Sequence, residues 1–163
     1  MFSRFRRAER KGSVPSVVVL GGGYGGVYAA LELQGAAKRG EIKLTLISRE
    51  NFFLFQPMLA EVISGSISPL NVVSPIRRIV PHAQVHQAEV ESVDTGSRTV
   101  AIRYPGHARL TTISYDHLIF AVGSATNLSQ FPGVEEHGMS FKTLGDAFRL
   151  RNHLISMLEA ANV

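Results

Sequence analysis

The sequence contains no cysteine among its 163 residues. This absence excludes disulfide bonds, cysteine–metal sites, thiol nucleophiles and C-x-x-C redox chemistry from the chain. The sequence also lacks any apolar run of the roughly 18 residues that a transmembrane helix needs. Hydrophobic residues still make up 45% and charged residues 18% of the chain, which indicates a globular domain with a buried core.

Positive charge is concentrated at the start of the chain. The basic residues of this segment are Arg4, Arg6, Arg7, Arg10 and Lys11, and with Glu9 they account for the whole net charge of +4. We predict that residues 1–13 form a basic, flexible tail. Contact with anionic lipid is the alternative, because Phe2 and Phe5 lie between the arginines. The neutral remainder extends no basic patch, so we expect no nucleic-acid partner.

A glycine-rich turn is the most informative motif. Residues 17–26 read V-V-V-L-G-G-G-Y-G-G, in which an apolar strand leads into the spacing G-x-G-x-x-G. Gly21 allows the sharp turn, Gly23 allows the backbone to approach a pyrophosphate, and Gly26 allows a helix to pack close to the strand. A helix over 26–38 would direct its N-terminal N–H groups towards the phosphates. The motif therefore predicts a dinucleotide-binding site.

The order of apolar and turn-forming segments predicts an α/β fold, a Rossmann-type parallel sheet with an antiparallel β-meander crossover. Thr143 and Asp146 have the spacing of a capping box that would begin a closing helix ending near residue 160. The expected strands are 14–20, 42–48, 85–93, 99–103, 110–114 and a final buried strand at 118–122, with helices over 26–38 and 71–80.

Histidines give no sign of a metal site. His82 and His86 have the i, i+4 spacing of ligands on a helix, but Pro81 precedes them and a strand is expected to follow. Since a zinc site needs three or more protein ligands, we predict no metal site.

Three stretches of the sequence resemble one known family. They are V-V-V-L-G-G-G-Y-G-G-V-Y-A-A-L-E-L, L-T-L-I-S-R-E-N-F-F-L-F-Q-P-M-L-A-E-V-I-S-G and Y-D-H-L-I-F-A-V-G-S-A-T-N, and the later K-T-L-G-D-A-F-R-L-R-N-H-L fits the same pattern. Together they resemble the N-terminal FAD-binding half of the two-dinucleotide flavoprotein oxidoreductases. Within that group they are most similar to the type II, non-proton-pumping NADH:quinone oxidoreductases, for which the F-Q-P-M-L run is the most discriminating part.

The resemblance implies that FAD is the cofactor and that residues 14–163 form an FAD-binding domain. It implies pyrophosphate contacts at Gly21, Gly23, Tyr24, Gly25 and Gly26, and contacts with the adenosine ribose at residues 48–50, which are Ser48, Arg49 and Glu50. It places Val90 near the adenine. The pyrophosphate–ribityl region would be contacted by Ala121, Gly123 and Ser124. Gln56 and Pro57 would lie near the flavin and its quinone-facing side. It assigns no catalytic residue.

The ribose contact departs from the general fingerprint, which has an acidic residue about 20 positions after the glycines. Ser48 stands at that place, and Glu50 supplies a carboxylate only if the loop curls back. Arg49 allows a third interpretation, because an arginine there accepts the 2′-phosphate of NADP. These alternatives remain open at the level of sequence.

The resemblance also implies a reaction that needs more than the residues of this chain. In the complete enzyme NADH reduces FAD by hydride transfer and the flavin then reduces quinone, which makes NADH and quinone its partners. Family members hold NADH on a second G-x-G-x-x-G domain, and the present sequence has one such motif. We therefore expect this chain, lacking that domain and the C-terminal region, to bind FAD without catalysing the reaction alone.

The alternative function is a non-catalytic FAD- or NAD(P)-binding module that works with a partner chain or is a truncated remnant. For location, the resemblance implies a respiratory-chain protein of the cytoplasm, peripheral on the inner face of the cell membrane. A homodimer stays open.

Overall fold

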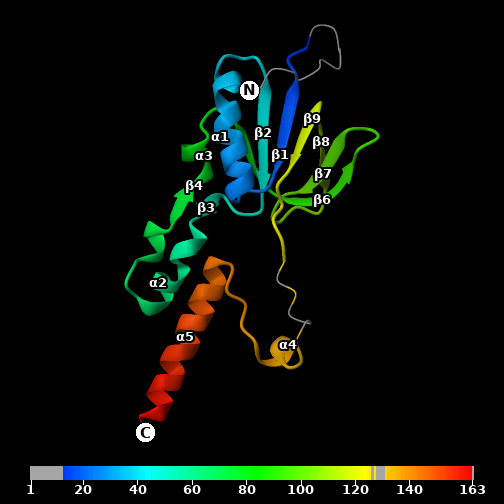
Figure 1. Cartoon of the computed structure of the whole chain (residues 1–163). Coiled ribbons are helices and arrows are strands. Elements are labelled where there is room, and N and C mark those ends of the chain that lie inside the picture. The colour runs from blue at the N-terminus through cyan, green and yellow to red at the C-terminus, as the bar shows by residue number, and fades with distance from the viewer. Residues whose placement is uncertain (1–12, 126, 128–130, 163) are drawn as a thin grey trace. The chain divides into compact units, whose positions relative to one another are not determined.

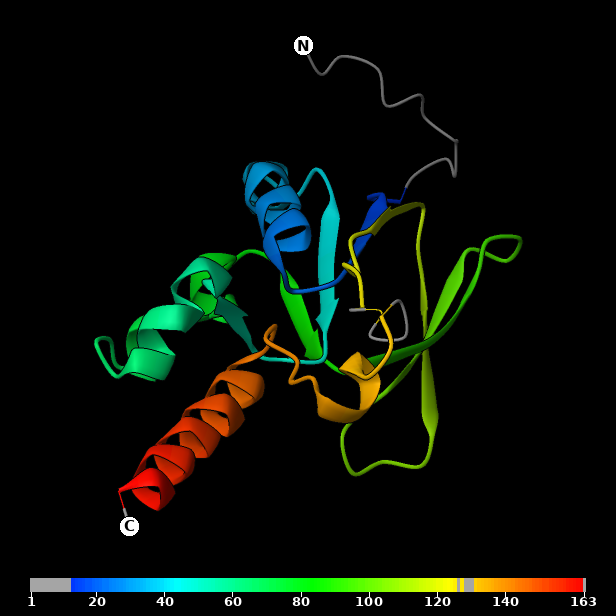
Figure 2. The same cartoon turned by 60° about the horizontal axis from the view of Figure 1, so that its bottom comes forward.

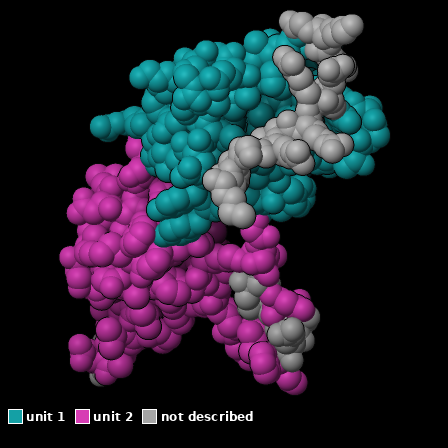
Figure 3. All heavy atoms as spheres, turned by 45° about the horizontal axis from the view of Figure 1, so that its top comes forward, with its two compact units in different colours: residues 1–51, 76–122 teal, residues 52–75, 123–163 magenta. Residues whose placement is uncertain are grey.

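The computed structural model describes residues 13–125, 127 and 131–162. The basic residues of the expected tail lie outside the described part of the chain. The chain divides into two compact units, which Figure 3 distinguishes by colour. Unit 1 comprises Met1–Asn51 and Ile76–Val122, and unit 2 comprises Phe52–Pro75 and Gly123–Val163.

Unit 1 is built on a four-stranded parallel sheet with the strand order β5-β2-β1-β9. The strands are β1 (Ser16–Leu20), β2 (Lys43–Ser48), β5 (Gln84–Gln87) and β9 (His117–Phe120). Helix α1 (Tyr24–Lys38) connects β1 to β2, and the short helix α3 (Ile76–Ile79) precedes β5 (Figure 1). β1 is central, since it pairs with β2 on one side and with β9 on the other.

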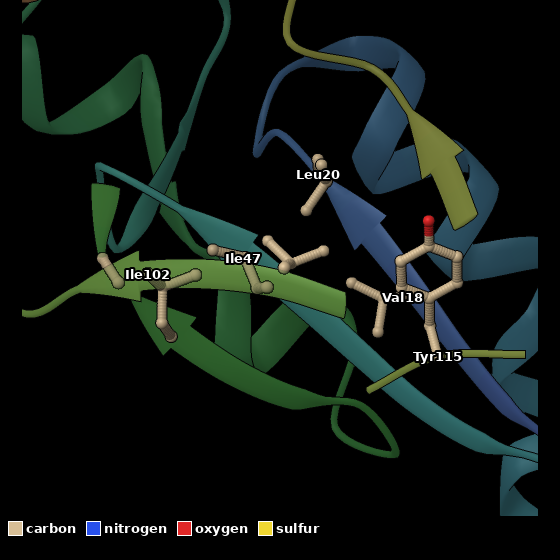
Figure 4. Packing of buried hydrophobic residues seen from close by; sticks show 7 residues of the cluster. Val18, Leu20, Ile47, Ile102 and Tyr115 are labelled. Atoms are coloured by element: carbon tan, nitrogen blue, oxygen red, sulfur yellow. The ribbon is translucent and has the colours of Figure 1, made fainter. Parts of the chain in front are cut away.

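Alternate residues of β1 bury their side chains on opposite faces of this sheet. Val19 faces α1, where its Cγ1 atom lies 3.4 Å from the position of a Cβ added to Gly26. Val18 and Leu20 face the other way and form a buried cluster with Ile47 and Ile102 (Figure 4). β1 is therefore covered on both faces, which explains its nearly continuous apolar sequence.

The second layer of unit 1 is an antiparallel meander that supplies Ile102 to this cluster. Its strands are β6 (Glu89–Asp94), β7 (Thr99–Arg103) and β8 (Leu110–Ser114), in the order β6-β7-β8 (Figure 2). A β-bulge shifts the register between Val90 and Ser92. Val100 and Ile102 of β7 are fully buried and join the parallel sheet to the meander.

Unit 2 combines a two-stranded antiparallel sheet with helices. Its elements are β3 (Phe52–Leu54), the 3₁₀ turn η1 (Gln56–Met58), α2 (Leu59–Ser64), the 3₁₀ turn η2 (Pro69–Asn71), β4 (Val73–Pro75), α4 (Val134–His137) and α5 (Leu144–Ala161). Its core consists of Leu59 and Val62 of α2 with Val72 and Ala147. α2 and the first turns of α5 are thus packed through small and branched apolar side chains.

The predicted fold class is confirmed: a parallel sheet carries an antiparallel meander, and 99–103 and 110–114 are strands. The single strand expected over 85–93 is wrong, because β5 and β6 belong to different sheets. The chain changes partner at Ala88, whose N–H donates to the Ser48 carbonyl at 2.8 Å and whose side chain is buried. An alternating apolar pattern indicates an extended strand, but it does not show where the chain leaves one sheet and joins another.

Two further elements differ from expectation. The helix predicted over 71–80 is reduced to α3, because the chain before it pairs as β4 with β3. The last strand of the sheet, β9, is half-buried rather than buried, and Phe120 at its end is 66% exposed.

The predicted capping box at the start of α5 is present. The Asp146 N–H donates to Thr143 Oγ1 at 3.1 Å, and the Asp146 carboxylate accepts from the Thr143 N–H at 2.9 Å. Burial of this carboxyl group acts to raise its pKa, but hydrogen bonds from the Thr143 and Lys142 N–H groups, the Thr143 hydroxyl and Arg149 outweigh it and lower the pKa to about 2. Asp146 therefore stabilises the fold in its ionised form.

Replacement of this carboxylate tests the capping box. Asp146→Asn is expected to lower the free energy of unfolding at pH 7 by about 1–2 kcal/mol, the range for loss of a helix N-cap interaction. The folded-state pKa lies below the usual 3.8, so the ionic contribution is complete above that pH and is lost as the pH falls towards 2. Urea unfolding at pH 7, 4 and 3 should show the difference from wild type shrinking with acidification. A difference independent of pH would contradict this role.

Candidate cofactor-binding site

The carboxyl ends of β1 and β9 meet where the order of strands reverses in the sheet. From β1 the chain proceeds to β2 and β5 on one side, and it returns as β9 on the other side. Directly beyond the strands, the Ala121 N–H donates to the Leu20 carbonyl at 2.9 Å, and the Gly21 N–H donates to the Ile47 carbonyl at 2.8 Å. In open α/β sheets ligands bind at such a switch point.

The backbone of the glycine loop is packed too closely for side chains at two fingerprint positions. Gly21 has a φ of +109°, and a Cβ there would lie 2.2 Å from the Ala121 carbonyl oxygen. A Cβ on Gly26 would lie 1.9 Å from the Gly21 carbonyl oxygen. Because these two residues lack a Cβ atom, the chain can turn sharply after β1 and α1 can start close to the end of that strand.

Gly22 is an additional position that sequence reasoning missed. A Cβ on this residue would lie 2.3 Å from Ser48 Oγ and 2.7 Å from Ile76 Cδ1. The fingerprint G-x-G-x-x-G leaves this position unspecified, and the detectable signal was the uninterrupted run of three glycines. Gly22 therefore lets the loop lie against the end of β2.

Gly23, in contrast, borders open space. A Cβ added to it would meet no atom within 4 Å, and its φ of −83° is accessible to any residue. Gly23 is the N-cap of α1, with no side-chain capping bond, and the first turn of α1 has no acidic residue. The positive end of the helix dipole is therefore not offset by a local carboxylate. Open space at a helix N-terminus suits an anionic pyrophosphate group, so these residues fit a dinucleotide.

Other predicted residues of unit 1 surround this loop to different degrees. Ser48 is 8% exposed and lies beside Gly22, whereas Arg49 and Glu50 are exposed. Ala121 lies within contact distance of both Gly21 and Gly25, for which an added Cβ would be 3.5 Å from the Ala121 Cβ. Tyr24 stacks on Tyr28 along α1, with 6.3 Å between ring centroids. Val90 is half-buried in β6 of the meander.

Two predicted residues of unit 2, Gln56 and Ser124, are linked through Lys142, which the sequence had not singled out. Gln56 Nε2 donates to the Lys142 carbonyl at 2.7 Å. The Lys142 ammonium group donates to Ser124, to its main-chain carbonyl and at 3.0 Å to its Oγ atom. Gly123 has a φ of +73°, which favours glycine, and Pro57 is exposed within η1. The K-T-L-G-D run beside the capping box was the available signal for Lys142.

His82 and His86 do not share a site. His82 is exposed, while His86 Nδ1 lies 2.5 Å from the Tyr104 hydroxyl oxygen. Burial and the nearby charge of Arg77 lower the pKa of His86, which favours the neutral ring. Within the described ranges no three histidine or carboxylate side chains are grouped so that they could hold a metal ion.

The fold and the loop define an α/β dinucleotide-binding protein. A family model described as pyridine nucleotide-disulphide oxidoreductase matches residues 15–162, and the chain belongs to this family. Within it, the chain corresponds to the FAD-binding region of proteins like the type II NADH:quinone oxidoreductases, which confirms the resemblance drawn from the sequence motifs. The family binds FAD.

Individual relatives agree with this assignment. The chain is 30% identical over 150 residues to demethylphylloquinone reductase NdbB of Synechocystis, covering 90% of this chain and 37% of that protein. It is 32% identical over 148 residues to the type II NADH:quinone oxidoreductase Ndh of Mycobacterium tuberculosis, covering 89% and 31%. The structure of NDH2 from Plasmodium falciparum in complex with NADH matches with a TM-score of 0.79 and 26% identity, covering 93% of this chain and 31% of that chain.

The chain therefore spans about a third of the length of these relatives. Among the described residues, no helix is both long and apolar enough to cross a membrane.

Two adjacent glycines allow a matched test of this geometry. Gly22→Ala is expected to lower the free energy of unfolding by about 1–3 kcal/mol, because its methyl group overlaps buried atoms of Ser48 and Ile76. Gly23→Ala places the same methyl group in open space and should cost no more than about 0.5 kcal/mol, the small preference of an N-cap for glycine over alanine. Chemical denaturation of the two variants provides the comparison, and equal stabilities would refute the close packing at Gly22.

Proposed function

We propose that this chain is the FAD-binding part of a flavoprotein NADH:quinone oxidoreductase. The observation that carries the proposal is the contrast within the glycine loop. The backbone at Gly21, Gly22 and Gly26 is packed against its neighbours, while Gly23 faces open space at the start of α1. A loop of this kind presents N–H groups to phosphate without a side chain in the way.

Each unit contributes its own proposed contacts. In unit 1, the pyrophosphate would be bound by Gly21, Gly23, Tyr24, Gly25 and Gly26. The ribose would be contacted by Ser48 or by the exposed Arg49 and Glu50. Val90 would lie near the adenine, and Ala121 would lie near the pyrophosphate–ribityl region. In unit 2, Gly123 and Ser124 would lie near the pyrophosphate–ribityl region, and Gln56 and Pro57 would approach the flavin and its quinone-facing side. Of the three ribose candidates, Ser48 has the strongest support, because it lies against the glycine loop.

In the complete enzyme, FAD would supply the chemistry of accepting a hydride from NADH and donating electrons to quinone. The residues of this chain serve to hold and orient that cofactor. The names of the relatives, which include NADH:quinone and NAD(P)H–ubiquinone oxidoreductases, support this reaction for the complete protein. The respiratory chain and the membrane surface would then be its setting, with NADH and quinone as the partners of the whole enzyme.

A substitution at the open glycine tests cofactor binding without disturbing the fold. Gly23→Val is expected to weaken FAD binding at least tenfold, because the added side chain would occupy the space left for the pyrophosphate. Quenching of FAD fluorescence measures the dissociation constant, and the melting temperature without FAD should stay closer to wild type than that of Gly22→Ala. Wild-type affinity in the variant would place the cofactor elsewhere.

If this chain binds FAD and another domain of the complete enzyme binds NADH, the absorption spectrum of this chain should show it. The chain has one glycine fingerprint, so bound FAD should show its visible band and keep it when NADH is added without oxygen. Dithionite should bleach the same band, which confirms that the flavin is reducible. Bleaching by NADH alone would show that this chain also holds the nicotinamide.

A further inference from the structure

Lys142 is anchored at every polar group of its main chain. Its N–H donates to Asp146 Oδ2 at 3.1 Å, and its carbonyl accepts from Gln56 Nε2 at 2.7 Å. It directly precedes Thr143, the N-cap of α5. The origin of its side chain is therefore fixed by the buried Asp146 and by the first turn of the helix.

The side chain of Lys142 returns to a segment that precedes it by 18 residues. The ammonium group donates both to the carbonyl and to the hydroxyl of Ser124. This interaction links Ser124, in the third stretch of the family resemblance, to the residue before the N-cap of α5. Ser124 itself is exposed, so no burial holds it in place. The Lys142 ammonium group is thus the hydrogen-bond donor to both oxygens of Ser124.

Among the residues that the structure describes, no carboxylate pairs with the ammonium group of Lys142. Among the described residues, the ion pairs of the structure do not include Lys142. Asp146, the nearest acid in its network, uses its oxygens on main-chain N–H groups, Ser140 and Arg149. A lysine ammonium group has three N–H donors, and Ser124 occupies two of them. Within the described part of the chain, the positive charge of Lys142 therefore lies beside Ser124 without an acidic partner.

From these contacts we propose that Lys142 is a positioning residue for FAD. It holds Gly123 and Ser124 in the conformation in which they meet the cofactor, and it adds a positive charge next to them that favours the anionic pyrophosphate-containing ligand. This inference rests on the proposed function, because the role of Ser124 as a cofactor contact is part of that proposal.

Variants of the full chain separate this role from a structural one. Lys142→Gln is expected to raise the FAD dissociation constant about tenfold, in keeping with loss of charge-assisted hydrogen bonds, while Lys142→Arg keeps charge and donors and should restore most of the affinity. Ser124→Ala should weaken binding less, and the double variant should bind no worse than Lys142→Gln alone. Lys43→Gln, at the opposite, amino end of β2, removes the same charge and should bind like wild type.

The readouts are the dissociation constant from FAD fluorescence, the visible circular dichroism of bound FAD, and amide exchange at Ser124 without cofactor. The expected result is weaker binding, an altered flavin signal and faster exchange in Lys142→Gln, with no loss in Lys43→Gln. Wild-type affinity in Lys142→Gln, or failure of Lys142→Arg to restore it, would overturn the role of Lys142 while leaving FAD binding intact. Absence of FAD binding to the wild-type chain would overturn the proposed function and this inference together.

Discussion

The close approach of three backbone segments beyond the carboxyl ends of β1, β2 and β9 is the constraint on which the rest of unit 1 depends. Gly21 lies against the Ala121 carbonyl, Gly26 lies against the Gly21 carbonyl, and Gly22 lies against Ser48. None of these approaches leaves room for a Cβ atom. They fix the exit of the chain from the sheet and the start of α1, and they leave the space at Gly23 open. The geometry that makes the fold compact here is the same geometry that exposes helix N–H groups to a phosphate.

The sheet behind this loop is covered on both faces, and the ends of its strands position the loop through backbone hydrogen bonds. α1 covers the face that contains Val19, while the meander buries Val18 and Leu20 through Val100 and Ile102. Four parallel strands alone would leave one apolar face exposed, which parallel sheets avoid. The meander therefore supports the proposed binding site and also connects β5 to β9. In unit 2, the buried Asp146 has a similar structural role, because its hydrogen bonds hold the main chain of Lys142 and the N-cap residue of α5 in place.

Much of this arrangement could be predicted from the sequence, because the signals were local. The glycine spacing identified the turn after β1, and Thr143 with Asp146 identified the start of α5. The division of the 85–93 segment between two sheets was missed, since the partner of a strand is set by contacts distant in sequence. Gly22 and Lys142 were missed for the same reason. The role of Gly22 depends on its closeness to Ser48 and Ile76, and that of Lys142 on its closeness to Ser124. Only folding brings these residues together.

FAD binding at the glycine loop between β1 and α1 can be tested by following the backbone amide signals of the labelled chain by NMR during a titration with FAD. We expect the largest shifts at Gly21–Gly26 and smaller ones at Ser48 and Ala121, while β8 at the far edge of the meander stays unaffected. Shifts absent from the glycine loop, or concentrated at another part of the chain, would contradict it.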